Sequence, residues 1–135
     1  MRSGKNYTIL YIDDDADDVQ MLQEAIHTID PAIELRKAND GEEGLSTLSD
    51  MEHGGQPPCL IVLDINMPRL DGRQTFKRIK ADPRWMTIPI VIFSTSNNPM
   101  DKMFFGGKNV EYITKPISFS HLLQVAQRLL SFCAT

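Results

Sequence analysis

Residues 59–68 constrain the fold most, because they contain an uninterrupted apolar run that ends at a carboxylate. Residues 60–63 read Leu-Ile-Val-Leu, a pattern typical of a strand buried on both faces of a parallel sheet. Such a strand cannot hide a charge in its middle. We therefore expect Asp64, the next residue, to lie where the strand leaves the sheet, at the edge where open α/β sheets bind their ligands.

Strand-like and helix-like segments alternate along the rest of the chain. Besides residues 60–63, we expect strands over residues 7–12, 33–38, 89–93 and 110–114. Apolar spacing and capping residues predict helices over residues 17–29, 42–50, 75–80 and 99–105, and a last helix capped by Ser118. Turn residues punctuate the pattern at Asp30-Pro31, Asn39-Asp40-Gly41, Pro68, Asp71-Gly72, Asp82-Pro83 and Gly106-Gly107. Five alternations with short links predict a parallel sheet covered by helices on both faces.

Length and composition predict one domain and exclude several classes of partner. The chain has 135 residues, so we expect a single domain with its core over about residues 6–133 and no output domain. Its net charge is −4 and it has no basic run, which argues against direct binding to nucleic acid. The N-terminal segment shows neither a signal peptide nor a membrane span. Cys59 and Cys133 lack metal-type spacing, so we expect no structural disulfide and a reducing, cytoplasmic location.

Polar side chains follow four of the five expected strands. Because the connections of parallel strands are right-handed, all carboxyl ends meet at one edge of the sheet. The residues expected at this edge are Asp13 and Asp14 after the first strand, Asp64 after the third, Ser94 and Thr95 after the fourth, and Lys115 after the fifth.

These residue types suit phosphoryl chemistry. Carboxylates about 4 Å apart repel by roughly 4 kcal/mol per pair at an effective dielectric near 20, and a cation would relieve that repulsion. Oxygen ligands favour Mg²⁺, which Asp13, Asp14 and Asp64 would hold, with a backbone carbonyl after Asp64 as a further ligand. Lys115 and Ser94 would face an incoming phosphoryl group from the other side. A carboxylate nucleophile, Mg²⁺ and a lysine suffice for phosphoryl transfer.

Four motifs in this order resemble those of a response regulator receiver domain. They are Tyr-Ile-Asp-Asp-Asp at residues 11–15, Leu-Asp-Ile-Asn-Met-Pro at 63–68 followed by Asp71-Gly72, the Ser94-Thr95 pair, and Thr-Lys-Pro at 114–116. Residues 81–91 are also similar to the single-domain regulators found beside phytochrome-type kinases. Two positions depart from the family pattern: Thr95 is larger than the Ala or Gly common there, and Asp15 adds a third acid.

The resemblance implies a flavodoxin-like (βα)5 fold, with strand order 2-1-3-4-5, that works in two-component signalling and is not a conventional enzyme. It implies that Asp64 accepts a phosphoryl group from a histidine kinase or phosphotransfer protein, and that Mg²⁺ binds Asp13, Asp14, Asp64 and the backbone carbonyl of Asn66. Switch roles are implied for Ser94, Thr95 and Tyr112, together with a cis bond before Pro116. The responding face would be the fourth helix, fifth strand and fifth helix, which would bind a downstream protein or form a homodimer. We also expect the segment around Gly106-Gly107 to become ordered on phosphorylation.

Other interpretations fit the sequence less well. A haloacid dehalogenase-type phosphatase shares the order Asp, Ser/Thr, Lys, but it needs an acid after the lysine, and residues 116–135 contain none. A calcium loop starting at Asp13 would need a glycine where Asp18 stands. A purely structural domain would not need every functional position filled. We expect Asp17 and Asp18 to form a solvated helix face. His27, His53 and His121 lack metal-ligand spacing and are expected at the surface.

Overall fold

The computed structural model describes residues 7–67, 70–96, 98–108 and 110–133. Five parallel strands form one sheet in the order β2-β1-β3-β4-β5, which confirms the predicted flavodoxin-like topology. The strands are β1 (Thr8–Ile12), β2 (Glu34–Ala38), β3 (Leu60–Leu63), β4 (Ile90–Ser94) and β5 (Glu111–Thr114). Pro68, which we expected to break the pattern after β3, lies outside the described residues.

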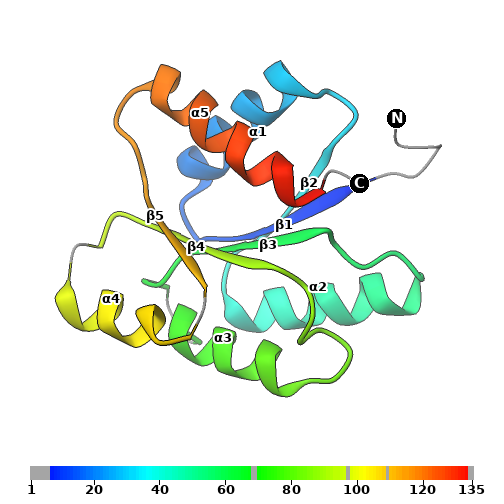
Figure 1. Cartoon of the computed structure of the whole chain (residues 1–135). Coiled ribbons are helices and arrows are strands. Elements are labelled where there is room, and N and C mark those ends of the chain that lie inside the picture. The colour runs from blue at the N-terminus through cyan, green and yellow to red at the C-terminus, as the bar shows by residue number, and fades with distance from the viewer. Residues whose placement is uncertain (1–6, 68–69, 97, 109, 134–135) are drawn as a thin grey trace.

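Helices cover both faces of the sheet (Figure 1). On one face lie α1 (Ala16–Ile29) and α5 (Phe119–Leu130), and a short 3-10 turn, η1 (Ser131–Cys133), follows α5. On the other face lie α2 (Gly41–His53), α3 (Gly72–Ala81) and α4 (Pro99–Gly106). The third helix begins three residues before its predicted start, because Asp71 and Gln74 form a reciprocal capping box at its first turn.

Alternate residues of β1 point to opposite faces of the sheet and pack into two separate hydrophobic cores. Ile9 and Tyr11 belong to the core packed under α1 and α5, whereas Leu10 and Ile12 belong to the core under α2, α3 and α4. Residues Leu60–Leu63 are all buried, as expected for a strand covered on both faces. The interiors of β3 and β4 are wholly apolar, so the polar side chains associated with these two strands lie at their ends.

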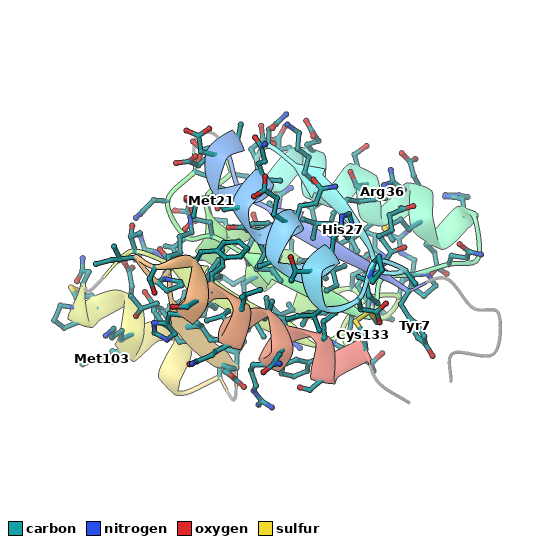
Figure 2. The ribbon with its side chains drawn as sticks, turned by 90° about the horizontal axis from the view of Figure 1, so that it is seen from above. Tyr7, Met21, His27, Arg36, Met103 and Cys133 are labelled. Carbon is teal, nitrogen blue, oxygen red and sulfur yellow. A yellow bond between two sulfur atoms is a disulfide. The ribbon has the colours of Figure 1, made fainter. Side chains whose placement is uncertain are left out.

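The structure joins Cys59 and Cys133 in a disulfide, so our expectation of no disulfide is wrong. Their Cα atoms lie 5.2 Å apart although 74 positions separate the residues in sequence. Figure 2 shows Cys133 beyond the end of α5, and the disulfide places it beside Cys59, the residue before β3. Sequence spacing did not reveal this pair, because only the packing of α5 on the sheet brings the two cysteines together.

The peptide bond before Pro116 differs from the expectation. The described residues contain no cis peptide bond, so the cis bond implied before Pro116 is absent and Lys115 leaves β5 through a trans bond. The preference between the two forms of a bond to proline is only about 0.5–1 kcal/mol, so local contacts decide it.

Among the described helices, none is long and apolar enough to cross a membrane.

Candidate functional site at the carboxyl edge of the sheet

Backbone hydrogen bonds fix Asp13, Asp64 and Lys115 at the carboxyl edge of the sheet. Each residue directly follows a strand, and its amide donates to the last carbonyl of a neighbouring strand, at 2.9, 3.0 and 3.0 Å respectively. The strand ladder therefore continues one residue past the strand ends, and it holds these three side chains over the edge. This arrangement confirms the predicted meeting of the first, third and fifth strand ends.

Three carboxylates gather at this edge. Oxygens of Asp13, Asp14 and Asp64 all lie within 4.8 Å of one another. Asp13 and Asp64 are buried, whereas Asp14 is exposed to solvent. Negatively charged oxygen ligands at this spacing suit a divalent cation of the hard, oxygen-binding kind.

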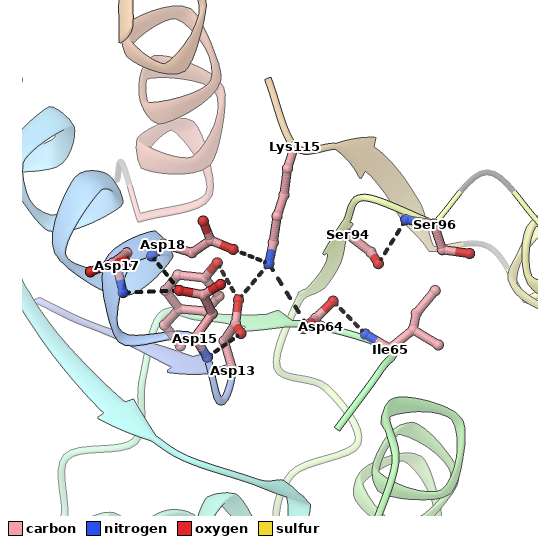
Figure 3. A network of polar contacts seen from close by, with 10 residues as sticks. Asp13, Asp15, Asp17, Asp18, Asp64, Ile65, Ser94, Ser96 and Lys115 are labelled. Atoms are coloured by element: carbon pink, nitrogen blue, oxygen red, sulfur yellow. Dashed lines mark hydrogen bonds and ion pairs between the residues drawn. The ribbon is translucent and has the colours of Figure 1, made fainter. Parts of the chain in front are cut away.

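The ammonium of Lys115 lies between the carboxylates of Asp13, Asp18 and Asp64 (Figure 3). Its Nζ is 2.7 Å from Asp13 Oδ2 and 2.7 Å from Asp18 Oδ2, and 3.8 Å from Asp64 Oδ2. Burial alone would lower the pKa of Lys115, but its hydrogen bonds to Asp13 and Asp18, together with the charges of Asp64 and Asp13, outweigh that effect and raise the pKa. Asp18 is therefore not only part of a solvated helix face, as we expected, but a direct partner of this lysine.

The surroundings of Asp64 oppose its ionisation. Burial raises its pKa from an ordinary 3.8 to about 6, and the neighbouring charge of Asp13 adds to the effect. Lys115 and hydrogen bonds from Ser94 and from the amide of Ile65 act in the opposite direction. The Ile65 amide donates to Oδ1 at 2.9 Å, while Oδ2 faces the lysine. The two oxygens of Asp64 therefore have different surroundings.

The remaining acids of the first loop have structural partners. Asp13 accepts hydrogen bonds from the hydroxyl of Tyr11 at 2.7 Å and from the amide of Asp15 at 2.9 Å. Asp15, the extra acid of the sequence motif, caps α1 by accepting from the amides of Asp17 and Asp18. Asp15 therefore stabilises the first turn of α1, the turn in which Asp18 lies.

A glycine allows α3 to approach the loop after β3. A Cβ on Gly72 would collide with the backbone carbonyl of Asp64 and lie 2.6 Å from the Cα of Ile65. The Gly72 amide in turn donates to the Ile65 carbonyl at 2.8 Å. The Asp71-Gly72 pair, recognised in sequence as a turn, is thus also a packing requirement of the site.

Ser96 connects the site to β5 and α4. Its amide donates to Ser94 Oγ at 3.2 Å, its carbonyl accepts from the hydroxyl of Tyr112 at 2.8 Å, and its own hydroxyl donates to Asp101 at 2.8 Å. Asp101 is buried and also pairs with Arg73 of α3 at 2.8 Å. Sequence reasoning missed Ser96, Asp101 and Arg73, because their contacts are set by the path of the loop after β4.

The remaining predicted residues differ in how far they are buried. Ser94 is fully buried, while Thr95 and Asn66 are exposed. Burial raises the pKa of Tyr112, although its hydrogen bond to Ser96 opposes this. The three histidines are exposed, as expected.

Comparisons with known proteins identify the family. The family model described as "Response regulator receiver domain" matches residues 9–127. The chain is 33% identical to the response regulator Rcp1 of Synechocystis over 92% of this chain and 86% of that protein. A phosphorylated cyanobacterial phytochrome response regulator, RcpA, superposes with a TM-score of 0.85 at 32% identity, covering 97% of this chain and 98% of that one. The Mn²⁺-bound form of Rcp1 superposes with a TM-score of 0.78 at 31% identity over 94% of both chains. The resemblance noted in the sequence is confirmed, and the chain belongs to the response regulator receiver domain family.

Proposed function

We propose that Asp64 accepts a phosphoryl group from the phosphohistidine of a histidine kinase or phosphotransfer protein. The observation that carries this proposal is the position of Asp64: a buried carboxylate at a strand end, with one oxygen 3.8 Å from a lysine and two further carboxylates beside it. The family supports a role in signalling. Beyond its own phosphorylation and dephosphorylation, we propose no reaction for it.

The geometry favours Oδ2 of Asp64 as the attacking oxygen. Oδ1 already accepts the hydrogen bond from the Ile65 amide, which leaves Oδ2 facing Lys115. Attack by Oδ2 would form an O–P bond as the N–P bond to the donor histidine breaks, and the histidine nitrogen would leave with the electron pair. Lys115 and the buried hydroxyl of Ser94 would bind the equatorial phosphoryl oxygens.

Asp13, Asp14 and Asp64, together with the backbone carbonyl of Asn66, would hold Mg²⁺. The acidic cluster and the oxygen character of its donors support a divalent cation, and the Mn²⁺-bound form of Rcp1 shows that a related regulator binds one. When bound, Mg²⁺ neutralises charge that develops on the transferring phosphoryl group. The protein's own part is to align Asp64 and, through Lys115, to oppose the burial that favours its neutral form.

Signalling would follow from contacts that differ between the two states. A phosphoryl oxygen on Asp64 can accept a hydrogen bond from Ser94, with Thr95 beside it, and Ser96 links Ser94 to the Tyr112 hydroxyl. We propose that this connection changes the face of α4, β5 and α5, which would bind a downstream protein or a second copy of the chain. Met100 and Met103 stand exposed on α4 at this face, as Figure 2 shows for Met103. A shift of about 1–3 kcal/mol between states would suffice to change partner affinity.

The test is intact-mass spectrometry after incubation with acetyl phosphate, with and without Mg²⁺. The wild type should gain one phosphoryl group in the presence of Mg²⁺, and Asp64→Asn should gain none. Asp50→Asn, which changes an exposed residue of α2, is the matched control and should label like the wild type. Labelling of Asp64→Asn at the wild-type rate would overturn the proposal.

A further inference from the structure

Asp18 lies in the first turn of α1 and forms one of the two short ion pairs of Lys115. Its Oδ2 is 2.7 Å from the ammonium, and its side chain is 33% exposed while that of Lys115 is 9% exposed. The amide of Asp18 donates to the capping carboxylate of Asp15 at 3.2 Å, which fixes the start of the helix. The contact therefore joins the first turn of α1 to the residue that follows β5.

The hydrogen-bonding capacity of Lys115 limits what else it can hold. An ammonium has three N–H donors. Asp13 and Asp18 each take one at 2.7 Å, whereas Asp64 Oδ2 lies at 3.8 Å, which is too far for a hydrogen bond. In Figure 3 the ammonium is drawn between the α1 side of the site and Asp64. The two short pairs thus set its position.

Asp18 differs from the other carboxylates because it stands outside the cluster that suits a metal. That cluster consists of Asp13, Asp14 and Asp64. A divalent cation held there would compete with Lys115 for Asp13. Asp18 is a partner of Lys115 for which such a cation would not compete directly.

We infer that Asp18 is a positioning residue that holds Lys115 toward α1 and weakens the interaction of the Lys115 ammonium with a phosphoryl group bound to Asp64. The inference rests on the proposed function and deepens it. A phosphoryl oxygen must draw on the same ammonium that Asp18 partly neutralises at 2.7 Å. Removing the charge of Asp18 should therefore tighten the binding of a phosphoryl mimic. For a partly exposed ion pair we expect an effect of about twofold to fivefold.

The experiment is a titration with fluoroberyllate at saturating Mg²⁺. Asp18→Asn should bind the mimic about twofold to fivefold more tightly than the wild type. Asp17→Asn is the matched control, since it removes the same charge from the same helical turn at an exposed residue. It should leave the affinity unchanged. Asp18→Glu, which keeps the charge, should lie closer to the wild type than Asp18→Asn does. No change in Asp18→Asn, or an equal change in Asp17→Asn, would overturn the inference.

A second measurement separates this inference from the proposed function. Nuclear magnetic resonance can follow proton exchange from the Lys115 ammonium in the folded protein without Mg²⁺ or fluoroberyllate. Exchange should be faster in Asp18→Asn than in the wild type and unchanged in Asp17→Asn. Equal exchange in all three would show that the ion pair is absent, and the inference would fail while phosphoryl acceptance stood. If the wild type does not bind fluoroberyllate at all, the proposed function fails, and the positioning role fails with it even where exchange changes.

Discussion

The two edges of the sheet are built in opposite ways. At the carboxyl edge, Asp13 and Asp64 are buried charges that share Lys115, and burial raises the pKa of Asp64. At the amino edge, the link between Cys59 and Cys133 ties the start of β3 to the end of α5. The first edge carries groups that would be more stable apart, whereas the second holds the helical layer to the sheet covalently. A covalent link at one edge can therefore offset the cost of burying repelling carboxylates at the other.

The largest expected effect comes from breaking the disulfide. Closing a loop across 74 positions is expected to stabilise the fold by roughly 4 kcal/mol in the chain-entropy treatment. Cys133→Ser should therefore lower the free energy of unfolding measured in urea, and it should leave phosphoryl labelling of the folded protein unchanged. The wild type in reducing agent should behave like the variant. Two free thiols per chain in the purified, non-reduced protein would contradict this link.

The next effect is the pH dependence of the free energy of unfolding that arises from Asp64. Because folding raises the pKa of Asp64 from 3.8 to about 6, the folded state holds that proton more tightly than the unfolded chain does. The resulting stabilisation is complete below about pH 4 and is lost as the pH rises through about 6, by up to roughly 3 kcal/mol. Urea unfolding of the metal-free wild type should show this loss between pH 4 and 7. In Asp64→Asn that part of the loss should be missing, and identical pH profiles for the two proteins would refute the assignment.

A smaller effect should follow from filling the space at Gly72. Gly72→Ala places a methyl group against the backbone of Asp64 and Ile65, so we expect a loss of about 1–3 kcal/mol and slower labelling. Gly106→Ala is the matched control, because a Cβ there would meet nothing within 4 Å. It should be neutral or slightly stabilising in the same thermal melts. Equal stability of the two alanine variants would count against close packing of α3 on the site.

The smallest change in stability is expected for the exposed member of the acidic cluster. Asp14→Ala removes repulsion from Asp13 and Asp64 but buries nothing, so the metal-free protein should melt slightly higher, by a degree or a few. Its Mg²⁺ affinity, measured by calorimetric titration, should fall. Asp17→Ala serves as the charge-matched control outside the cluster. A Mg²⁺ titration of Asp14→Ala that matches the wild type would remove Asp14 from the site.

The sequence allowed us to predict the positions of those site residues that directly follow a strand. Asp13, Asp64 and Lys115 could be placed together because parallel strands share a carboxyl edge, whatever the details of packing. The partners of these residues could not be found in this way. The contact of Asp18 with Lys115 depends on how closely the first turn of α1 approaches the end of β5, and local helix periodicity is consistent with a solvated residue there.

Loop paths and chain ends account for the other differences. Ser96 and Asp101 meet because the chain folds back between β4 and α4, and no local pattern marks that contact. The cysteine pair likewise arises only when α5 is packed and η1 turns back toward β3. Local patterns thus identified the elements and the edge of the sheet where the candidate site lies. The contacts between residues distant in sequence required the packed structure.

Mapping the phosphorylated residue tests the central claim most directly. The wild type, labelled with acetyl phosphate and Mg²⁺, would be treated with borohydride, which reduces an aspartyl phosphate to homoserine, and then digested and sequenced by tandem mass spectrometry. We predict homoserine at residue 64, in the peptide that carries Leu63 and Ile65, and none at the other acids of the edge. Homoserine at Asp13 or Asp14 with residue 64 unmodified would contradict the assignment of Asp64 as the phosphoryl acceptor.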